Sequence, residues 1–320
     1  MQKIINFIKQ NIQLHQTWLL SLILGIGVIF YDLNISFLEI FVTFFTVIWL
    51  DLVITSYNKW KWVFPFSWVN AGFWISFFLR SDEILIYVFA WFLAIFSKYL
   101  FTSGWKHFFN PSNFGVFVSL IIFPSIAWTN PLQWWQSVEL QTYIFALIMI
   151  LTFWFFIVSR LIKILNYKFY DLIIAFVIAH LVLYFSITQE SGVSSFYLFF
   201  NASFLVFIFF MITDPKTNAL TRSSRILYAI STALMFYVLQ FYINENYSLL
   251  GSLFCMTMCL PLIWKLEKKS VVLCNIKFNL SIVFLLFFIT FLLLYMCFMV
   301  MLEGKVDLLF DNRCNQIMCK

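Results

Sequence analysis

The sequence has little charge. Charged residues make up 11% of the 320 residues, against about 25% in an ordinary soluble domain. Lysine and arginine number 20, and aspartate and glutamate number 14, which gives a net charge of +6. A chain of this size cannot hide its apolar majority in one soluble core. A soluble globular domain is therefore excluded, and the modest positive charge gives no reason to expect nucleic-acid binding.

Catalytic and metal-binding side chains are also scarce, with three histidines and six cysteines. The sequence contains no hydrolase triad, glycine-rich phosphate loop, zinc-ligand spacing or pair of catalytic carboxylates. Cys255, Cys259 and Cys297 lie in apolar runs, where a cysteine acts as a small apolar residue. Cys314 and Cys319 are candidates for one small disulfide loop. These absences predict at most a non-catalytic subunit.

Apolar residues are what the chain has in abundance. They form 63% of 320 residues, or about 200, and a transmembrane helix needs ~20, which is enough for about ten spans. The sequence therefore predicts an all-α integral membrane protein with 10 to 11 transmembrane helices. The apolar runs cover residues 17–31, 36–56, 63–79, 83–101, 111–127, 138–158, 169–188, 194–213, 224–243, 247–264 and 279–302.

The charges between these runs alternate in sign. Basic residues occupy every second connection: Lys3 and Lys9, Lys59 and Lys61, Lys98 and Lys106, Arg160 to Lys168, Lys216 to Arg225, and Lys265 to Lys277. The connections between them carry Asp32, Arg80 with Asp82 and Glu83, Glu139, Glu190 and Glu245. Cytoplasmic loops are the basic ones in membrane proteins. We therefore expect a multi-pass protein of the cell inner (plasma) membrane with a cytoplasmic N-terminus.

The runs also divide the chain. Residues 1–16 read as an interfacial segment, and no cleavage site of a signal peptide follows the first run. The main membrane domain is expected at 17–265, with halves at about 17–130 and 138–265. An additional helix at 279–302 and a short tail at 303–320 complete the chain.

Two polar clusters interrupt the apolar pattern, and each contains an Asx-Pro step. The first runs from Gly104 to Gly115 and the second from Thr213 to Thr221. Proline removes a backbone donor, and Asn or Asp before it can cap a helix that begins at the proline. The free N–H groups of such a broken helix suit a polar or anionic ligand. The candidate binding residues are Lys106, His107, Asn110, Pro111, Asn113, Asp214, Pro215, Lys216 and Thr217.

Two interpretations of these clusters stay open. Paired broken helices in two halves are typical of transporter-like folds with a site between the halves. Two ordinary proline-started helices at the membrane surface would give the same pattern. The charge pattern places both breaks near the cytoplasmic side, whereas a simple inverted repeat would place them on opposite sides.

Both clusters resemble motifs of one family. The segment from Lys106 to Gly115 resembles the K-x-x-F-N-P motif of the NqrB/RnfD family of membrane electron-transport subunits, and the segment from Phe210 to Thr217 resembles its F-M-x-T-D-P-x-[ST] motif. The resemblance covers about residues 36 to 265. It implies two five-helix repeats with broken helices, similar to urea transporters. The stretch from Asn110 to Trp135 looks closest to the UnbU-like branch, which is associated with enediyne biosynthesis.

The chain departs from the family at the flavin motif. Redox members carry FMN on the threonine of an S-[GST]-A-T motif, which this chain lacks. The stretch from Ser125 to Leu132 has about the right position but not the pattern, so covalent FMN on Thr129 is not expected. A flavin or quinone held without a covalent bond remains compatible with the resemblance.

Three functions follow from these observations. The chain is a membrane subunit of a redox or accessory complex with other membrane subunits as partners, a small-solute channel or transporter that uses a cavity between the breaks, or a ligand-free membrane scaffold. The lipid bilayer is a partner in all three. His180, near the middle of its span, is expected to be a hydrogen-bonded core residue.

Overall fold

The computed structural model describes residues 12–30, 35–57, 65–103, 106–129, 170–187, 204, 207–214, 217–243 and 245–273. Several predicted features lie outside these residues. They are most of the interfacial segment 1–16, the runs 138–158 and 279–302, most of the run 194–213, the tail with Cys314 and Cys319, and the site residues Pro215 and Lys216.

The described chain is mostly helical, as the apolar runs predicted. Its helices are α2 (Ile12–Phe30), α3 (Phe37–Tyr57), α4 (Phe66–Phe78), α5 (Ile84–Leu100), α6 (Pro111–Ile122), α8 (Tyr170–Ile187), the π-helix η2 (Phe207–Met211), α11 (Arg222–Tyr242), α12 (Glu245–Met258) and α13 (Leu260–Leu273). Four strands of two residues lie between them: β1 (Arg80–Ser81), β2 (Thr102–Ser103), β3 (Lys106–His107) and β4 (Ala127–Trp128).

Several of these helices have the length and apolarity of membrane helices. In the described part of the chain, two are long and apolar enough to cross a membrane, within α3 and α11. A third candidate forms if α12 and α13, which meet at a bend of 41°, count as one span. Parts of α2, α5, α6 and α8 are apolar but shorter. The described part of the chain is therefore mostly helical, with two or three candidate membrane-spanning helices, which is compatible with an all-α membrane protein.

The helix α3 has an exposed apolar face of the kind that membrane helices present to lipid. Its first turn carries a capping box: Ser36 N donates to Glu39 Oε2 at 2.8 Å, and Glu39 N donates to Ser36 Oγ at 3.2 Å. Large apolar side chains then follow every four residues along one exposed face: Phe37, Phe41, Phe45, Trp49 and Val53. This spacing gives one continuous apolar stripe, which suits contact with lipid.

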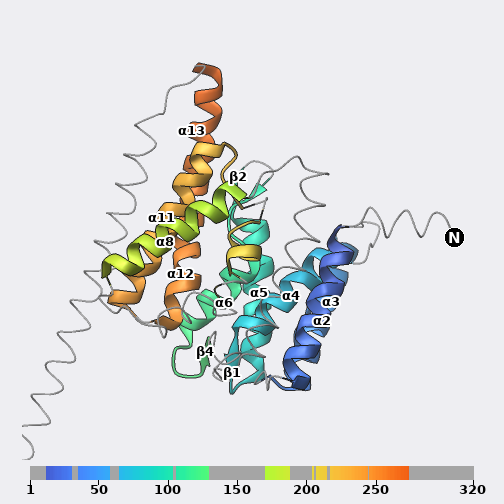
Figure 1. Cartoon of the computed structure of the whole chain (residues 1–320). Helices are drawn as coiled ribbons and strands as arrows, with labels where there is room; N and C mark the ends of the chain where they lie inside the picture. Colours follow the sequence, from blue (N-terminus) through green and yellow to red (C-terminus); the bar gives the residue numbers. More distant parts are fainter. Residues whose placement is uncertain are drawn as a thin grey trace, which may run out of the picture.

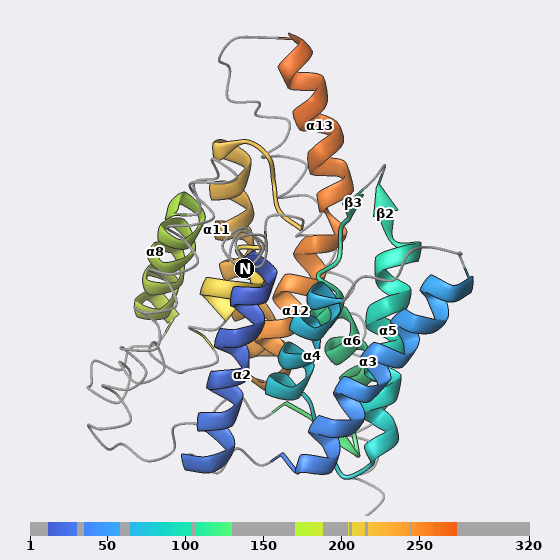
Figure 2. The same cartoon turned by 90° about the vertical axis from the view of Figure 1, so that its right-hand side faces the viewer.

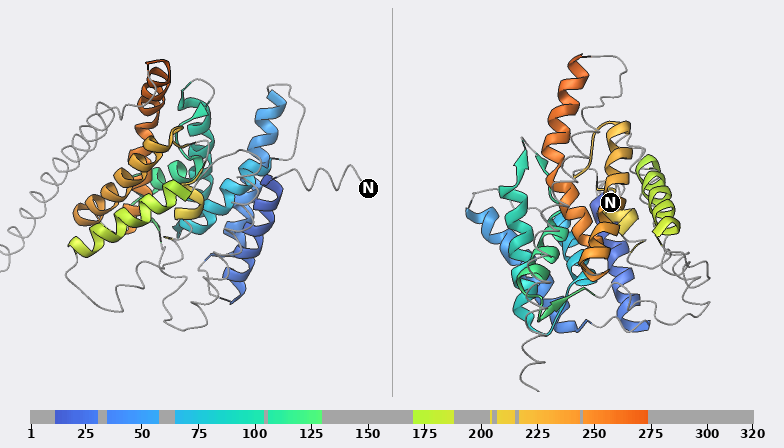
Figure 3. Two further views of the ribbon diagram at one scale, coloured as in Figure 1. Left: turned by 45° about the horizontal axis from the view of Figure 1, so that its top comes forward. Right: turned by 90° about the vertical axis from the view of Figure 1, so that its left-hand side faces the viewer.

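The helices lie in two groups that meet at α4, α6 and α12. On one side α4 packs against α2 and α3, and α5 packs against α6. On the other side α11 packs against both α8 and α12 (Figure 1). The helix α13 projects beyond the neighbouring helices in each view (Figures 1, 2 and 3).

Two short antiparallel pairs mark opposite ends of this bundle. The pair β2–β3 lies at one end, called here the hairpin end, and the pair β1–β4 lies at the other, called the bridge end (Figures 1 and 2). The helix α5 runs from the bridge end to the hairpin end, and α6 runs back to the bridge end (Figure 1).

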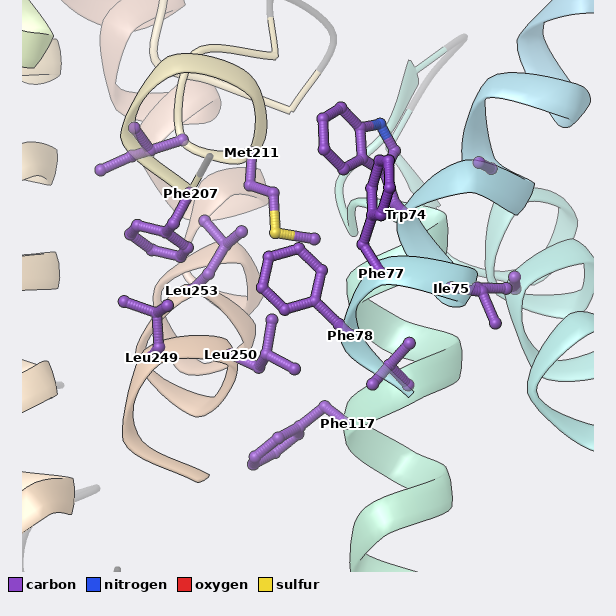
Figure 4. Close-up of a cluster of buried hydrophobic side chains, with 14 of the residues drawn as sticks. Trp74, Ile75, Phe77, Phe78, Phe117, Phe207, Met211, Leu249, Leu250 and Leu253 are labelled. Atoms are coloured by element: carbon purple, nitrogen blue, oxygen red, sulfur yellow. The ribbon is translucent and has the colours of Figure 1, made fainter. Parts of the chain in front are cut away.

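The apolar core lies where the two groups meet. Phe78 of α4 and Phe117 of α6 face Met211 of η2 and Leu250 of α12 (Figure 4). Trp74 stacks at a tilt on Phe210, with ring centroids 5.1 Å apart. The core therefore joins the first half of the chain to the segment that precedes the second Asx-Pro step.

Candidate functional site

The first Asx-Pro step begins a helix, as the sequence predicted. The side-chain oxygen of Asn110 accepts a hydrogen bond from Asn113 N at 3.3 Å and another from Ser112 Oγ at 2.8 Å. Pro111 occupies the first turn of α6, where its missing N–H costs nothing. Asn110 is therefore the N-cap of α6, and the positive end of that helix dipole lies at this residue.

Asn113 connects the first break to the second half of the chain by a hydrogen bond. Its Nδ2 donates to the backbone oxygen of Leu250 in α12 at 3.1 Å. This bond fixes which side of the amide holds the oxygen, because a flipped amide would place two oxygens together. Asn113 is 1% exposed, and its Oδ1 has no hydrogen-bond partner among the described residues. A buried acceptor without a donor is costly and suits a ligand that supplies an N–H or O–H.

Phenylalanine rings lie on both of the segments that this bond joins. Phe109 stacks on Phe254 of α12 with ring centroids 5.0 Å apart. Phe114 lies 4.8 Å from Phe109 and 5.7 Å from Phe254, and Phe117 lies 4.9 Å from Phe254, again between centroids. The first break thus combines one buried polar acceptor with a cluster of packed aromatic rings.

The second Asx-Pro step departs from the prediction. Asp214 does not begin a helix: residues 217–221 form bends, and α11 starts at Arg222. The cap is Thr221, whose Oγ1 accepts from Ser224 N at 3.3 Å. Asn218 supports the non-helical path, because its Nδ2 donates to Ile212 O at 2.7 Å and its Oδ1 accepts from Ala219 N at 2.9 Å.

Glu267 of α13 explains why the helix starts so late. Its carboxylate, 2% exposed, accepts from Leu220 N at 3.0 Å and from Thr221 N at 2.8 Å. A carboxylate at this position also suits the positive end of the α11 dipole. Local sequence does not indicate this role, since Glu267 stands among Lys265, Lys268 and Lys269 as part of a charged connection.

Arg225 lies in a buried ion pair and not in a basic surface patch. Its Nη2 donates to Asp171 Oδ2 at 2.6 Å, and its Nε donates to Asp171 Oδ1 at 3.2 Å. Its Nη1 donates to Leu220 O at 2.8 Å. This bidentate pair joins α8 to α11 and holds the end of the second break. The charge pattern predicted Arg225 as part of a basic connection between helices, and this prediction does not describe its buried position. Arg222, one turn earlier, is exposed, as expected for such a connection.

Trp264 of α13 links the two breaks. Its indole Nε1 donates to Asn218 O at 2.8 Å, and Lys106 Nζ of β3 lies 5.8 Å from its ring centroid. The first break contacts α12 through Asn113, and the second contacts α13 through Asn218. Both breaks therefore pack against one bent helix pair.

The remaining predicted residues fall into three groups. Lys106 is exposed and His107 is half-buried, both in the β2–β3 pair. Asp214 is half-buried, and Thr217 N donates to its backbone oxygen at 3.2 Å. Thr217 is 2% exposed, and its Oγ1 has no hydrogen-bond partner within the described ranges. Pro215 and Lys216 lie outside the described residues.

His180 is a core residue, as predicted. It lies 4.4 Å from Phe204 between ring centroids, and Tyr237 Oη donates to its backbone oxygen at 3.2 Å. The described residues contain no group of three or more metal-ligating side chains.

Thr129, the residue nearest to the position of the family's flavin threonine, directly follows β4 at the bridge end. Its Oγ1 is buried. The absence of a covalent flavin at Thr129 stays a prediction.

Neither a scan against protein-family models nor a search of curated proteins returned a match to this chain.

Proposed function

We propose that the chain is an integral membrane subunit of a redox or accessory complex, related to the NqrB/RnfD family, that binds a flavin without a covalent bond at the two helix breaks. In this proposal the chain has 10 to 11 spans, two five-helix repeats and a cytoplasmic N-terminus. Its partners are the bilayer and other membrane subunits.

The observation that carries the proposal is the pair of buried oxygens at the breaks. Asn113 Oδ1 and Thr217 Oγ1 come from segments 104 residues apart, and both segments pack against the α12–α13 pair. Asn113 Oδ1 only accepts hydrogen bonds, so its partner must carry a donor. The isoalloxazine ring of a flavin has an imide N–H and a flat face for the phenylalanines, whereas an oxidised quinone has no donor.

Different residues of the two breaks would contact different parts of the flavin. Asn113 and Thr217 would hold the ring edge, and the half-buried Phe254 would contact its face. Lys106, exposed at the hairpin end, would meet the phosphate. A bound flavin supplies one- and two-electron transfer, while this chain positions the ring and excludes water from it.

The visible spectrum of the purified full chain tests the proposal. We expect oxidised-flavin absorption bands, or quenching of FMN fluorescence on titration if the flavin is lost during purification. After denaturation the colour should leave the protein, and the gel band should not fluoresce. A fluorescent band that disappears in Thr129→Val would show covalent attachment instead.

Thr217→Val separates ligand binding from folding. The hydroxyl has no partner among the described residues, so its removal should leave thermal stability unchanged while FMN binding weakens up to about tenfold. The matched control is Thr232→Val in α11, away from the breaks. The buried hydroxyl of Thr232 donates a hydrogen bond of 2.7 Å to Tyr228 O. A colourless protein that also fails to quench FMN would end the flavin proposal and favour a channel or a scaffold.

Asp214→Asn should keep the fold and weaken FMN binding by about tenfold. The backbone N–H of Asp214 donates to Met211 O, and its backbone oxygen accepts from Thr217 N. Neither hydrogen bond involves the side chain that the substitution changes. A carboxylate accepts a stronger hydrogen bond than an amide does. The control is Glu245→Gln, at the first residue of α12, which should bind FMN like the parent chain. Equal FMN dissociation constants for the two variants would remove Asp214 from the site.

A further inference from the structure

A proline lies where the bent helix pair α12–α13 changes direction. The two helices follow one another toward the hairpin end and meet at a bend of 41° (Figures 1 and 2). Pro261 is the second residue of α13. It has no backbone N–H, so it cannot donate the hydrogen bond that a continuous helix would give to Thr257 O, four residues earlier. In a straight helix its ring would also clash with that carbonyl. Pro261 is therefore the physical cause of the bend.

The backbone at the bend ends one helix and starts another. Cys259 N donates to Met256 O at 3.1 Å, a three-residue bond of the tighter kind that often closes a helix. Ile263 N then donates to Cys259 O at 3.1 Å, at the start of α13. The thiol of Cys259 donates a weak hydrogen bond of 3.7 Å to Cys255 O, the carbonyl that a continuous helix would pair with Cys259 N. The bend therefore has hydrogen bonds of its own.

One face of α13 is buried, and this face meets the second break. Its buried residues follow the three- and four-residue spacing of a single helix face: Leu260, Ile263, Trp264 and Glu267. Lys265, between them in the sequence, is exposed. Trp264 Nε1 donates to Asn218 O at 2.8 Å, and Glu267 Oε1 accepts from Thr221 N at 2.8 Å. The helix α13 therefore holds the backbone of the second break at two points.

The bend decides whether these two bonds can form. The helix α12 is tied to the first break, because Leu250 O accepts from Asn113 Nδ2 at 3.1 Å. At ~1.5 Å per residue, Trp264 lies about 7.5 Å and Glu267 about 12 Å along the helix from Cys259. Straightening the pair by 41° would move the backbone by about 5 Å at Trp264 and by about 8 Å at Glu267. Displacements of this size break both hydrogen bonds, so a straight helix could not hold the two breaks together.

We propose that Pro261 is a positioning residue for the ligand site at the two breaks. Its bend lets one helix pair hold both breaks, which fixes where Thr217 stands relative to Asn113. Pro261 does not itself contact the ligand, since it acts through Trp264 and Glu267. The role in ligand binding rests on the proposed flavin site, whereas the role in holding the second break does not.

Amide hydrogen exchange of the purified full chain in detergent tests the bend without any ligand. Pro261→Ala supplies the missing N–H and lets the helix pair straighten. We expect the amides of Leu220 and Thr221 to exchange about tenfold faster than in the parent chain, because they lose the carboxylate of Glu267. The amide of Asn113, which is capped within the first break, should exchange at the parent rate.

Pro124→Ala is the matched control. Pro124 is exposed in the turn that follows α6 and interrupts no helix, so its replacement should keep the parent exchange rates. If Pro261→Ala fails to fold, Trp264→Phe decides. That variant keeps the bend and an aromatic ring but removes the donor to Asn218 O, so exchange in the second break should rise while the first break is unchanged.

Titration of the same variants with FMN extends the test to the ligand. Pro261→Ala should weaken FMN binding by about tenfold, like Thr217→Val, and Pro124→Ala should bind FMN like the parent chain. Parent exchange rates throughout the second break in both Pro261→Ala and Trp264→Phe would overturn the proposal. Fast exchange with unchanged FMN affinity would overturn the role of the bend in the ligand site. If the parent chain binds no FMN, the flavin proposal fails, and the exchange rates still decide whether the bend holds the second break.

Discussion

Arg225→Gln should destabilise the protein by about 3–5 kcal/mol, among the largest effects of any single substitution in the described chain. The change leaves the carboxylate of Asp171 buried, 2% exposed, with only the N–H of Leu172 at 2.9 Å as a donor among the contacts described. The bond from Arg225 to Leu220 O, which holds the end of the second break, is lost as well. Denaturant unfolding in detergent measures the change.

A control variant and a double variant separate the contribution of the ion pair from that of its neighbours. Arg222→Gln, one turn earlier and exposed, should change stability by less than about 0.5 kcal/mol. The double variant Asp171→Leu with Arg225→Met removes both charges, so it should be more stable than Arg225→Gln alone. Equal losses for Arg225→Gln and Arg222→Gln would mean that the ion pair contributes nothing.

Gly115→Ala should destabilise the packing of α5 on α6 by about 1–3 kcal/mol. An added Cβ would overlap the backbone oxygen of Ala90 and would lie 3.2 Å from the Cβ of Ala94. The backbone of a helix cannot rotate away as a flexible side chain can. The two helices would therefore have to separate, and the thermal midpoint should fall.

Gly25→Ala provides the opposite expectation in the same experiment. A Cβ at Gly25 in α2 would meet no described atom within 4 Å. Alanine is the better helix former by about 0.5–1 kcal/mol, so this variant should be as stable as the parent chain or slightly more stable. A loss at Gly25 as large as the loss at Gly115 would contradict the packing argument.

Local signals in the sequence were sufficient for the helices and for the first break. Long apolar runs predicted α3 and α11 to within a few residues, because burial in lipid or in the bundle needs only apolar length. Asn110 followed by Pro111 is a complete capping signal, and it needs no distant partner. The start of α6 was therefore predicted correctly, because the interactions that determine it lie within one helical turn.

The second break was misread because its partners are remote in the sequence. Asp214-Pro215 carries the same local signal as Asn110-Pro111, but α11 begins at Thr221 and Arg222 instead. Glu267 and Trp264, 46 or 47 residues after the backbone groups they bind, hold the intervening backbone, and Asp171 orients Arg225 from 54 residues earlier. No short sequence motif predicts such long-range contacts. Glu267, an acidic residue among lysines, was the one local feature that pointed to them.

The bond between Asn113 and Leu250 also has a consequence for the order in which the protein is made. The two residues are 137 positions apart, so α6 is capped and inserted long before its partner leaves the ribosome. The segment that ends at Thr221 must wait in the same way for Glu267 of α13. Since domains form progressively during synthesis, the helices come first and the two breaks are joined last. The bent pair α12–α13 therefore completes assembly, and a nascent chain without it lacks the helices against which both breaks pack.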